Sequence, residues 1–259
     1  MLMQKILHIK FAPVNKRPVI VFFTKITFSR KNLAYYIYRG EVKKINIKKI
    51  SIGETGFPKG LLAGTTKEIF FAGDISLLSG AVPVVAVIGR RDTSPAAAKN
   101  ARRCGEIAAE CGYIVLNGLA IGCDTKALEG ALSAGGRCVA VLPCGLDRIY
   151  PKSNIALAEK IVQKGGCLVT EYPSGTAPEK WRFVARDKIQ AQLADKILVV
   201  DCEEKSGTMY AVKEGARIGK KLGCIAGSSG ISSGNRYIAE HIGAESIKGE
   251  KTLKKFLEK

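Results

Sequence analysis

The chain has 259 residues, of which 46% are hydrophobic, and it carries a formal net charge of +18. This length and hydrophobic content suit one large domain with a substantial buried core, and the positive charge makes nucleic acid the first partner to consider. No apolar run approaches the ~20 residues that a membrane-spanning helix needs, and Lys5 and Lys10 interrupt the short N-terminal runs, so we expect neither a membrane partner nor a signal peptide.

The positive charge is concentrated at the N-terminus. Residues 1–50 hold twelve Lys or Arg and one acid, Glu41, which gives them +11 of the total. Residues 1–49 also hold seven of the eighteen aromatic residues, so they lack the low hydrophobicity of a disordered segment. We expect residues 1–49 to be a basic N-terminal extension that forms either a small β-rich element or a poorly docked tail.

The rest of the chain alternates short apolar runs with amphipathic segments of helix length. Residues 50–80 form a short lead-in with one strand at Glu68–Phe71. The later runs are hydrophobic at nearly every position, which indicates strands buried on both faces of a mostly parallel sheet. These predicted strands are Val84–Ile88, Tyr113–Leu116, Arg137–Leu142, Cys167–Thr170, Lys196–Asp201 and Leu222–Ala226.

The helices between these strands have recognisable ends. Ser94 followed by Pro95 is typical of an N-cap and a first helical residue, and Gly112 closes the same helix. The alternation of strands and helices predicts an α/β fold with a Rossmann-like, doubly wound sheet over residues 50–250. We expect residues 251–259 to form a basic C-terminal helix.

Two glycine-rich turns are expected at one edge of the sheet, Gly118–Asp124 and Lys205–Thr208. Each leaves a strand and enters a helix, so its backbone N–H groups and the positive end of the helix dipole attract a phosphate. Gly89 and Gly145 are expected at the same edge. In a doubly wound sheet, ligands gather where the carboxyl ends of the strands meet.

Cysteine and histidine give no sign of catalytic or metal chemistry. The eight cysteines include no C-x-x-C pair, and the only histidines are His8 and His241. We therefore expect buried, reduced thiols in a cytoplasmic protein, with no metal site, no cofactor and no histidine-based acid–base centre. Cys123 and Cys144 fall in glycine-rich loops, but without a base beside them we interpret both as structural.

Six stretches carry a family resemblance. They are Phe70–Leu78 with Ala86–Arg91, Asn117–Asp124 with Ala127–Ala131, Val139–Pro151, Glu171–Gly175, Phe183–Lys188 and Glu204–Thr208. In this order they resemble the motifs of the DprA/Smf family of DNA-processing proteins, and the resemblance covers roughly residues 50–250. Leu142–Pro151 is similar to a very characteristic loop of that family.

Several residues depart from these motifs. Arg90 stands where the family prefers a small hydroxyl residue, and Ile121 replaces an arginine. Asp187 and Lys188 replace an Asn-Arg pair, and Lys205 replaces an arginine. A lysine is a point charge rather than a bidentate fork, so this chain resembles a divergent member.

The resemblance implies an extended Rossmann core that binds single-stranded DNA, forms a homodimer and hands the DNA to a RecA-type recombinase in natural transformation or recombination. It implies no bond-breaking chemistry. Basic residues near the strand ends favour the same ligand, because they can track a nucleic-acid backbone while Phe183 stacks on a base. The candidate DNA- and phosphate-binding residues are Gly89, Arg91, Gly118, Gly122, Phe183, Arg186, Lys188, Lys205, Ser206 and Gly207.

Two other functions stay open. The chain is distantly similar to nucleotide phosphoribohydrolases, whose Gly-Gly-x-Gly-Thr-x-x-Glu loop carries a catalytic glutamate. Gly207 and Thr208 fit that loop, but Ala211 stands at the glutamate position. The nearest acid, Glu214, is three residues further on, where a helix turns it by about 300°. The second alternative is a module that senses a nucleotide without processing it.

Overall fold

The chain divides into two compact units, residues 1–32 and residues 33–259. The computed structural model describes residues 11–14, 17–20, 33–38, 41–61, 66–226 and 231–258.

Two antiparallel hairpins lie in the described part of the N-terminal extension. In the first unit, β1 (Phe11–Val14) pairs with β2 (Arg17–Ile20). In the second unit, β3 (Leu33–Tyr38) pairs with β4 (Glu41–Asn46). Every described residue before Ile47 therefore lies in a strand.

The second unit is built on a nine-stranded sheet. Its strands are β5 (Lys48–Ser51), β6 (Glu68–Gly73), β7 (Val84–Ile88), β8 (Ile114–Asn117), β9 (Cys138–Val141), β10 (Cys167–Thr170), β11 (Lys196–Val199), β12 (Lys221–Ile225) and β13 (Glu245–Ile247). The spatial order is β13-β12-β11-β7-β8-β9-β10-β6-β5. The strands from β13 to β10 are parallel, whereas β6 is antiparallel to both of its neighbours. The chain builds outward from β7 to β10 and then starts again at β11, on the other side of β7.

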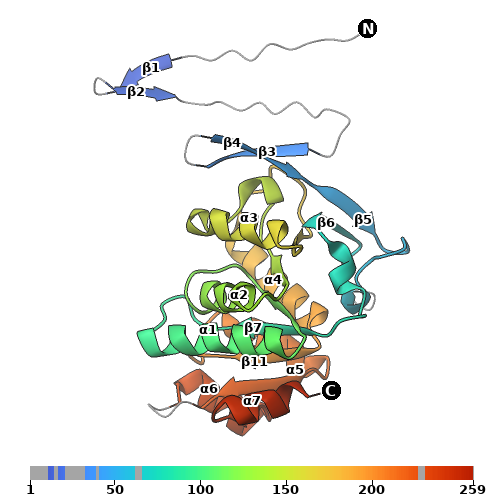
Figure 1. Cartoon of the computed structure of the whole chain (residues 1–259), viewed down its shortest axis with the longest axis vertical. Helices are drawn as coiled ribbons and strands as arrows, with labels where there is room; N and C mark the ends of the chain where they lie inside the picture. The colour runs from blue at the N-terminus through green and yellow to red at the C-terminus, as the bar shows by residue number, and fades with distance from the viewer. Residues whose placement is uncertain are drawn as a thin grey trace. The chain divides into compact units, whose positions relative to one another are not determined.

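Helices connect these strands. In the described residues they are α1 (Pro95–Glu110), α2 (Cys123–Ser133), α3 (Ile155–Gln163), α4 (Lys180–Leu193), α5 (Thr208–Arg217), α6 (Ser233–Tyr237) and α7 (Glu250–Leu257). Short 3-10 helices are η1 (Lys59–Leu61), η2 (Ile75–Leu78), η3 (Leu146–Arg148) and η4 (Lys152–Asn154), and η5 (Ile238–Ile242) is a turn of π-helix. Figure 1 shows these elements in chain order by colour.

The helices bury both faces of the sheet. All five residues of β7 are buried. Val85 and Val87 belong to a core shared with α1, α2, α3 and α7, whereas Val84, Ala86 and Ile88 belong to a second core shared with α4 and α5. Alternate side chains of one strand thus face two helical layers, because successive side chains of a strand point to opposite faces. The predicted doubly wound α/β fold is confirmed.

The predicted start of α1 is also found in the structure. The side chain of Ser94 accepts a hydrogen bond from the N–H of Ala97 at 3.2 Å, and Pro95 is the first helical residue. The helix is followed by Gly112, which has a positive φ of 79°. Both signals are local, so sequence alone was sufficient to place them.

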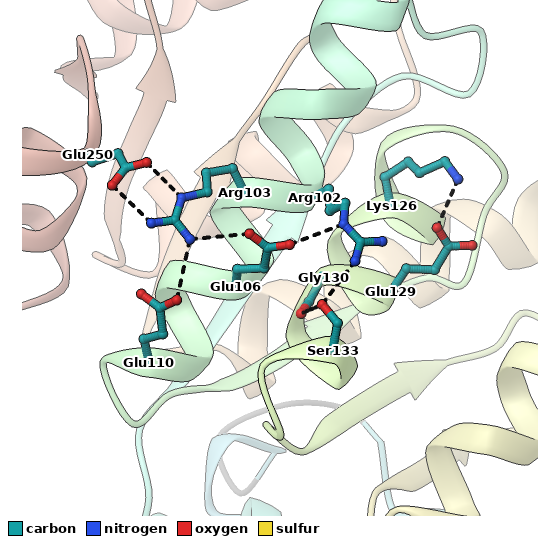
Figure 2. Close-up of polar contacts among 9 residues, drawn as sticks. All are labelled: Arg102, Arg103, Glu106, Glu110, Lys126, Glu129, Gly130, Ser133 and Glu250. Carbon is teal, nitrogen blue, oxygen red and sulfur yellow. Dashed lines mark hydrogen bonds and ion pairs between the residues drawn. The ribbon is translucent and has the colours of Figure 1, made fainter.

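The sheet and core of the second unit extend past both boundaries expected from the sequence, the one between residues 49 and 50 and the one between residues 250 and 251. β5 spans the boundary expected between residues 49 and 50, and it pairs with β6. At the other end, Phe256 of α7 is fully buried. Figure 2 shows Arg103 of α1 bound through two nitrogens to Glu250 of α7, at 2.7 and 3.0 Å. α7 is therefore packed into the α1 side of the core rather than standing apart from it.

The cysteines are free thiols, and the side chains that could bind a metal ion are not clustered in the described residues. All eight cysteines are free, and burial raises the pKa of Cys123 to about 11 and that of Cys144 to about 12. Within the described ranges, no group of three or more His, Cys, Asp or Glu side chains is placed to hold a metal ion. None of the helices described above has both the length and the apolar character to cross a membrane.

Candidate functional site

A cavity of about 400 Å³, which we call the switch-point cavity, lies at the point where the strand order reverses, between β7 and β11. The chain leaves these two parallel neighbours in opposite directions, so their connecting segments leave a crevice at the carboxyl ends. Four segments line it: the turn after β7, the loop into α2, one face of α4 and the N-terminus of α5. The lining residues are Ile88, Gly89, Arg90, Arg91, Ala120, Asp124, Arg186, Asp187, Gln190, Ser206, Gly207, Thr208 and Ala211.

The ten candidate residues gather around this cavity to different degrees. Five of them line it, namely Gly89, Arg91, Arg186, Ser206 and Gly207. Phe183 contacts two of these, Arg91 and Arg186. The remaining four are the exposed Lys188 and Lys205 and the loop glycines Gly118 and Gly122.

The loop into α2 is held by a buried carboxylate. Asp124 is 5% exposed, and its Oδ2 accepts hydrogen bonds from the backbone N–H groups of Gly118 at 3.0 Å and Ala120 at 3.3 Å. The predicted phosphate turn therefore has two of its N–H groups already bound to its own aspartate. A phosphate at this loop would have to replace Asp124, so the structure gives the Gly118 N–H a structural role.

Close packing explains a second glycine in this loop. Gly122 has a φ of 80°, and a Cβ there would lie 2.3 Å from the carbonyl oxygen of Arg91. A side chain at 122 would push the loop off the turn that carries Arg91. Gly122 thus positions the arginine and is a supporting residue of the site.

Arg186 is a buried connector between three elements. Its side chain is 5% exposed. Nη1 donates to the carbonyl oxygens of Gly118 and, at 3.1 Å, Val141, and Nε donates to Oδ1 of Asp187 at 2.8 Å. Arg186 therefore ties α4 to the ends of β8 and β9. The sequence predicts it as a phosphate ligand, and the structure instead engages both of these nitrogens within the protein.

Burial raises the pKa of both carboxylates around Arg186. Burial raises the pKa of Asp124 to about 6, although the positive charge of Arg186 opposes the shift. Burial also raises the pKa of Asp187, and the positive charge of Arg186 again opposes the shift. The inner wall of the cavity thus carries one buried cation between two acids.

The outer rim of the cavity pairs a cation with an aromatic ring. Arg91 is exposed, and its guanidinium carbon lies 5.0 Å from the centre of the Phe183 ring. Tyr150 contacts the same ring edge-on, with ring centres 5.7 Å apart. This arrangement presents a positive charge beside an aromatic surface, which suits a nucleotide phosphate and base.

Arg90 is engaged by acids from the segment after β11. Its Nη1 lies 2.8 Å from an oxygen of Glu203, and its Nε lies 3.9 Å from Oδ2 of Asp201. The backbone N–H of Arg90 also donates to the carbonyl oxygen of Asp201 at 2.8 Å. These bonds connect the turn after β7 to the segment that leads into α5.

Eight of the thirteen lining residues are not among the ten candidates, and of these eight only Gln190 had not been named in any motif or alternative. Gln190 is 2% exposed, and its Nε2 donates to Oδ1 of Asp187 at 2.7 Å. It follows Arg186 by four residues on α4, so the two share a helix face. This four-residue spacing could have identified Gln190 from the sequence, because a residue four positions from a helical residue that lines a cavity faces the same cavity.

The sheet order and this cavity define a doubly wound, Rossmann-like protein with a ligand-sized crevice where such sheets bind nucleotides and phosphates. A family model described as DNA recombination-mediator protein A matches residues 48–258. The chain therefore belongs to the DprA/Smf family of DNA-processing proteins.

Individual relatives support this assignment. The chain is 29% identical over 234 residues to Protein Smf of Synechocystis sp., which covers 88% of this chain and 58% of the relative. It is 32% identical over 190 residues to the DNA processing protein DprA of Streptococcus pneumoniae, covering 73% of this chain and 66% of the relative. The chain thus spans between about half and two thirds of the length of these curated relatives.

Solved structures show the same fold. The crystal structure of DprA from Streptococcus pneumoniae superposes with a TM-score of 0.72 at 30% identity, covering 79% of this chain and 72% of that one. DprA from Helicobacter pylori, whose structure is described in terms of its single-stranded DNA binding mode, gives a TM-score of 0.71 at 27% identity and covers 81% of this chain and 95% of that one.

Proposed function

We propose that this chain binds single-stranded DNA at the rim of the switch-point cavity and acts in DNA uptake and recombination. The observation that carries the proposal is the exposed guanidinium of Arg91 over the ring of Phe183, at the mouth of a ligand-sized cavity. A cation beside an aromatic face can hold a phosphate and stack a base without reading sequence. The single-stranded DNA binding of the Helicobacter pylori relative supports the same ligand.

In this proposal the phosphates contact the exposed cations and the bases contact the aromatic side chains. Arg91, Lys188 and Lys205 supply positive charge, and the N-terminus of α5 at Gly207 and Thr208 supplies N–H groups and a favourable helix dipole. Arg186 acts from behind this surface, because its bonds to Gly118 and Val141 fix the position of α4.

The surroundings of Glu214 favour binding over catalysis. Glu214 is 8% exposed, and its carboxylate is bound by Arg217 at 2.8 and 2.9 Å and by Nε2 of Gln192 at 3.2 Å. These bonds occupy the acid nearest to the glutamate position of the phosphoribohydrolase loop. The residue that does line the cavity there is Ala211, which has no group for acid–base chemistry.

We further propose that the protein works in the cytoplasm as a homodimer and delivers the bound strand to a RecA-type recombinase, without breaking a bond itself. Family membership supports these assignments. The free state of all eight cysteines is consistent with a reducing compartment.

Binding of a labelled single-stranded oligothymidine to the pure protein, followed by fluorescence anisotropy, tests the proposal. We expect submicromolar binding of the oligothymidine. An unlabelled duplex or a mononucleotide should displace it poorly. Removing the aromatic surface with Phe183→Ala should weaken binding roughly fivefold or more, because stacking contributes ~1–3 kcal/mol per base. Tight mononucleotide binding without oligomer binding, or release of a free base from a nucleoside monophosphate, would contradict it.

A further inference from the structure

A second arginine–aromatic pair lies on the same helix as Phe183, whose ring forms the rim pair with Arg91. Trp181 belongs to the first turn of α4 and is 57% exposed. The guanidinium carbon of Arg182 lies 4.9 Å from the centre of the Trp181 ring, close to the 5.0 Å of the rim pair. The first turn of α4 thus carries two aromatic rings, two residues apart in sequence, each beside a cation.

Neighbouring side chains hold the indole of Trp181 in place. Its Nε1 donates to Oε2 of Glu179 at 2.8 Å, and the ring of Tyr172 contacts it edge-on with ring centres 6.0 Å apart. Arg182 has a side chain that is 17% exposed and pairs with Glu179 at 3.2 Å, so it supports the indole from within the protein. An exposed ring that is already held in one orientation loses little conformational freedom when a ligand stacks on it.

Both pairs lie at the carboxyl edge of the sheet. Arg91 follows β7, and Phe183 contacts both Arg91 and Tyr150, which lies in the segment after β9. Tyr172, the ring beside Trp181, follows the last residue of β10 by two positions. β7 and β10 are separated by three strand spacings of about 4.8 Å each. The aromatic surface therefore continues along the strand ends, from the cavity toward β10.

The surroundings of Trp181 suit a nucleobase better than a protein partner. Trp181 has the highest exposed fraction of the large hydrophobic residues that are exposed in the described part of the chain. Its neighbours in sequence are the charged residues Glu179, Lys180 and Arg182. A protein interface buries a wide apolar core, which a single ring among charges does not provide. Stacking of a base needs only one ring face.

We propose that the bound single strand continues from the rim of the switch-point cavity across the carboxyl ends of β9 and β10 and stacks a second base on the indole of Trp181. Every base has a ring face, so this contact lengthens the binding surface without adding a sequence preference. This inference rests on the proposed function and extends it by a second stacking position.

The test uses the intrinsic fluorescence of the protein, because Trp181 is its only tryptophan. Stacking of a base quenches indole emission, so titration with unlabelled oligothymidine reports contact at this one residue. We expect quenching with the same dissociation constant that anisotropy gives for the labelled oligomer. Trp181→Ala should weaken binding about fivefold or more, the contribution of one stacked base. Trp181→Phe keeps an aromatic ring and should weaken binding less.

A matched control moves the tryptophan to the other end of the strands. Val82 is 37% exposed and precedes the first residue of β7 by two positions, so it lies at the amino end of that strand. Val82→Trp in the Trp181→Phe background should bind the oligomer without a change in emission.

Three outcomes would overturn the second stacking position and leave the proposed function intact. The first is binding by anisotropy while the emission of the wild type stays unchanged. The second is equal quenching of the indoles at positions 181 and 82, and the third is wild-type affinity in Trp181→Ala. Absence of binding in both measurements would overturn the proposed function as well.

Discussion

The guanidinium of Arg186 donates a hydrogen bond to the carbonyl oxygen of Gly118 and occupies the space that a side chain at 118 would need. A Cβ on residue 118 would lie 1.8 Å from Nη1 of that arginine. The glycine is thus explained by an arginine 68 positions away in the chain. The pair holds α4 against the loop into α2, beside the cavity that Arg186 lines.

Arg186→Met should destabilise the fold by about 3–5 kcal/mol, because it leaves Asp124 and Asp187 buried beside no cation. Urea unfolding followed by circular dichroism measures the change. Lys188→Met, two residues along the same helix but exposed, is the control and should change the free energy of unfolding by less than about 0.5 kcal/mol. A normally stable Arg186→Met protein would contradict the connecting role of this arginine.

The raised pKa of Asp124 predicts a pH-dependent stability. Its pKa in the folded protein is about 6, whereas an unfolded aspartate titrates near 3.9. Between these values the folded state keeps a proton that the unfolded state has lost, so stability falls as the pH rises from about 4 to 7. The free energy of unfolding of the wild type, compared with that of Asp124→Asn, should therefore fall by up to about 3 kcal/mol over this pH range. A difference that stays constant with pH would contradict this assignment.

Phe256→Ala should lower the free energy of unfolding by about 3–5 kcal/mol, because the Phe256 ring is fully buried and α7 belongs to the core. Lys255→Ala, at the exposed neighbouring position, should be close to neutral. Both free energies come from the same urea titration. If Phe256→Ala were as stable as Lys255→Ala, the C-terminal helix would be a separate appendage.

Glu203→Gln should strengthen binding of single-stranded DNA. Glu203 holds Arg90 at 2.8 Å, and removing its charge frees a cation at the cavity wall and lowers the repulsion of phosphate. We expect a gain of about threefold in affinity at 50 mM salt, consistent with an exposed ion pair. Glu204→Gln removes the same charge from the adjacent exposed position and should have a smaller effect. Equal gains in both variants would show only a change of net charge.

Local signals in the sequence predicted most of the fold. The hydrophobic run at Val84–Ile88 predicted a strand buried on both faces, and Ser94 with Pro95 predicted the start of α1. Both depend on neighbouring residues alone. The antiparallel direction of β6 was not predicted, because a short apolar strand carries no signal for the direction of its partner.

The site was harder to predict because its contacts are long-range. The glycine-rich turn into α2 was located correctly, but its N–H groups are bound to Asp124. The burial of Arg186 depends on Gly118 and Val141, which no spacing rule connects to it. Five of the ten candidate residues line the cavity, whereas the contrast between the exposed Arg91 and the buried Arg186 required the three-dimensional arrangement.

The salt dependence of oligothymidine binding by the wild type and by Arg91→Ala tests the central claim most directly. Each phosphate contact on a single strand adds about 0.7 to the slope of log K against log salt. We predict that Arg91→Ala weakens binding at 50 mM salt and lowers the slope by about this amount. The control, Arg137→Ala, removes an equal charge from the residue before β9, at the other end of the strands. Equal slopes for the wild type and both variants would contradict a DNA site at the cavity rim.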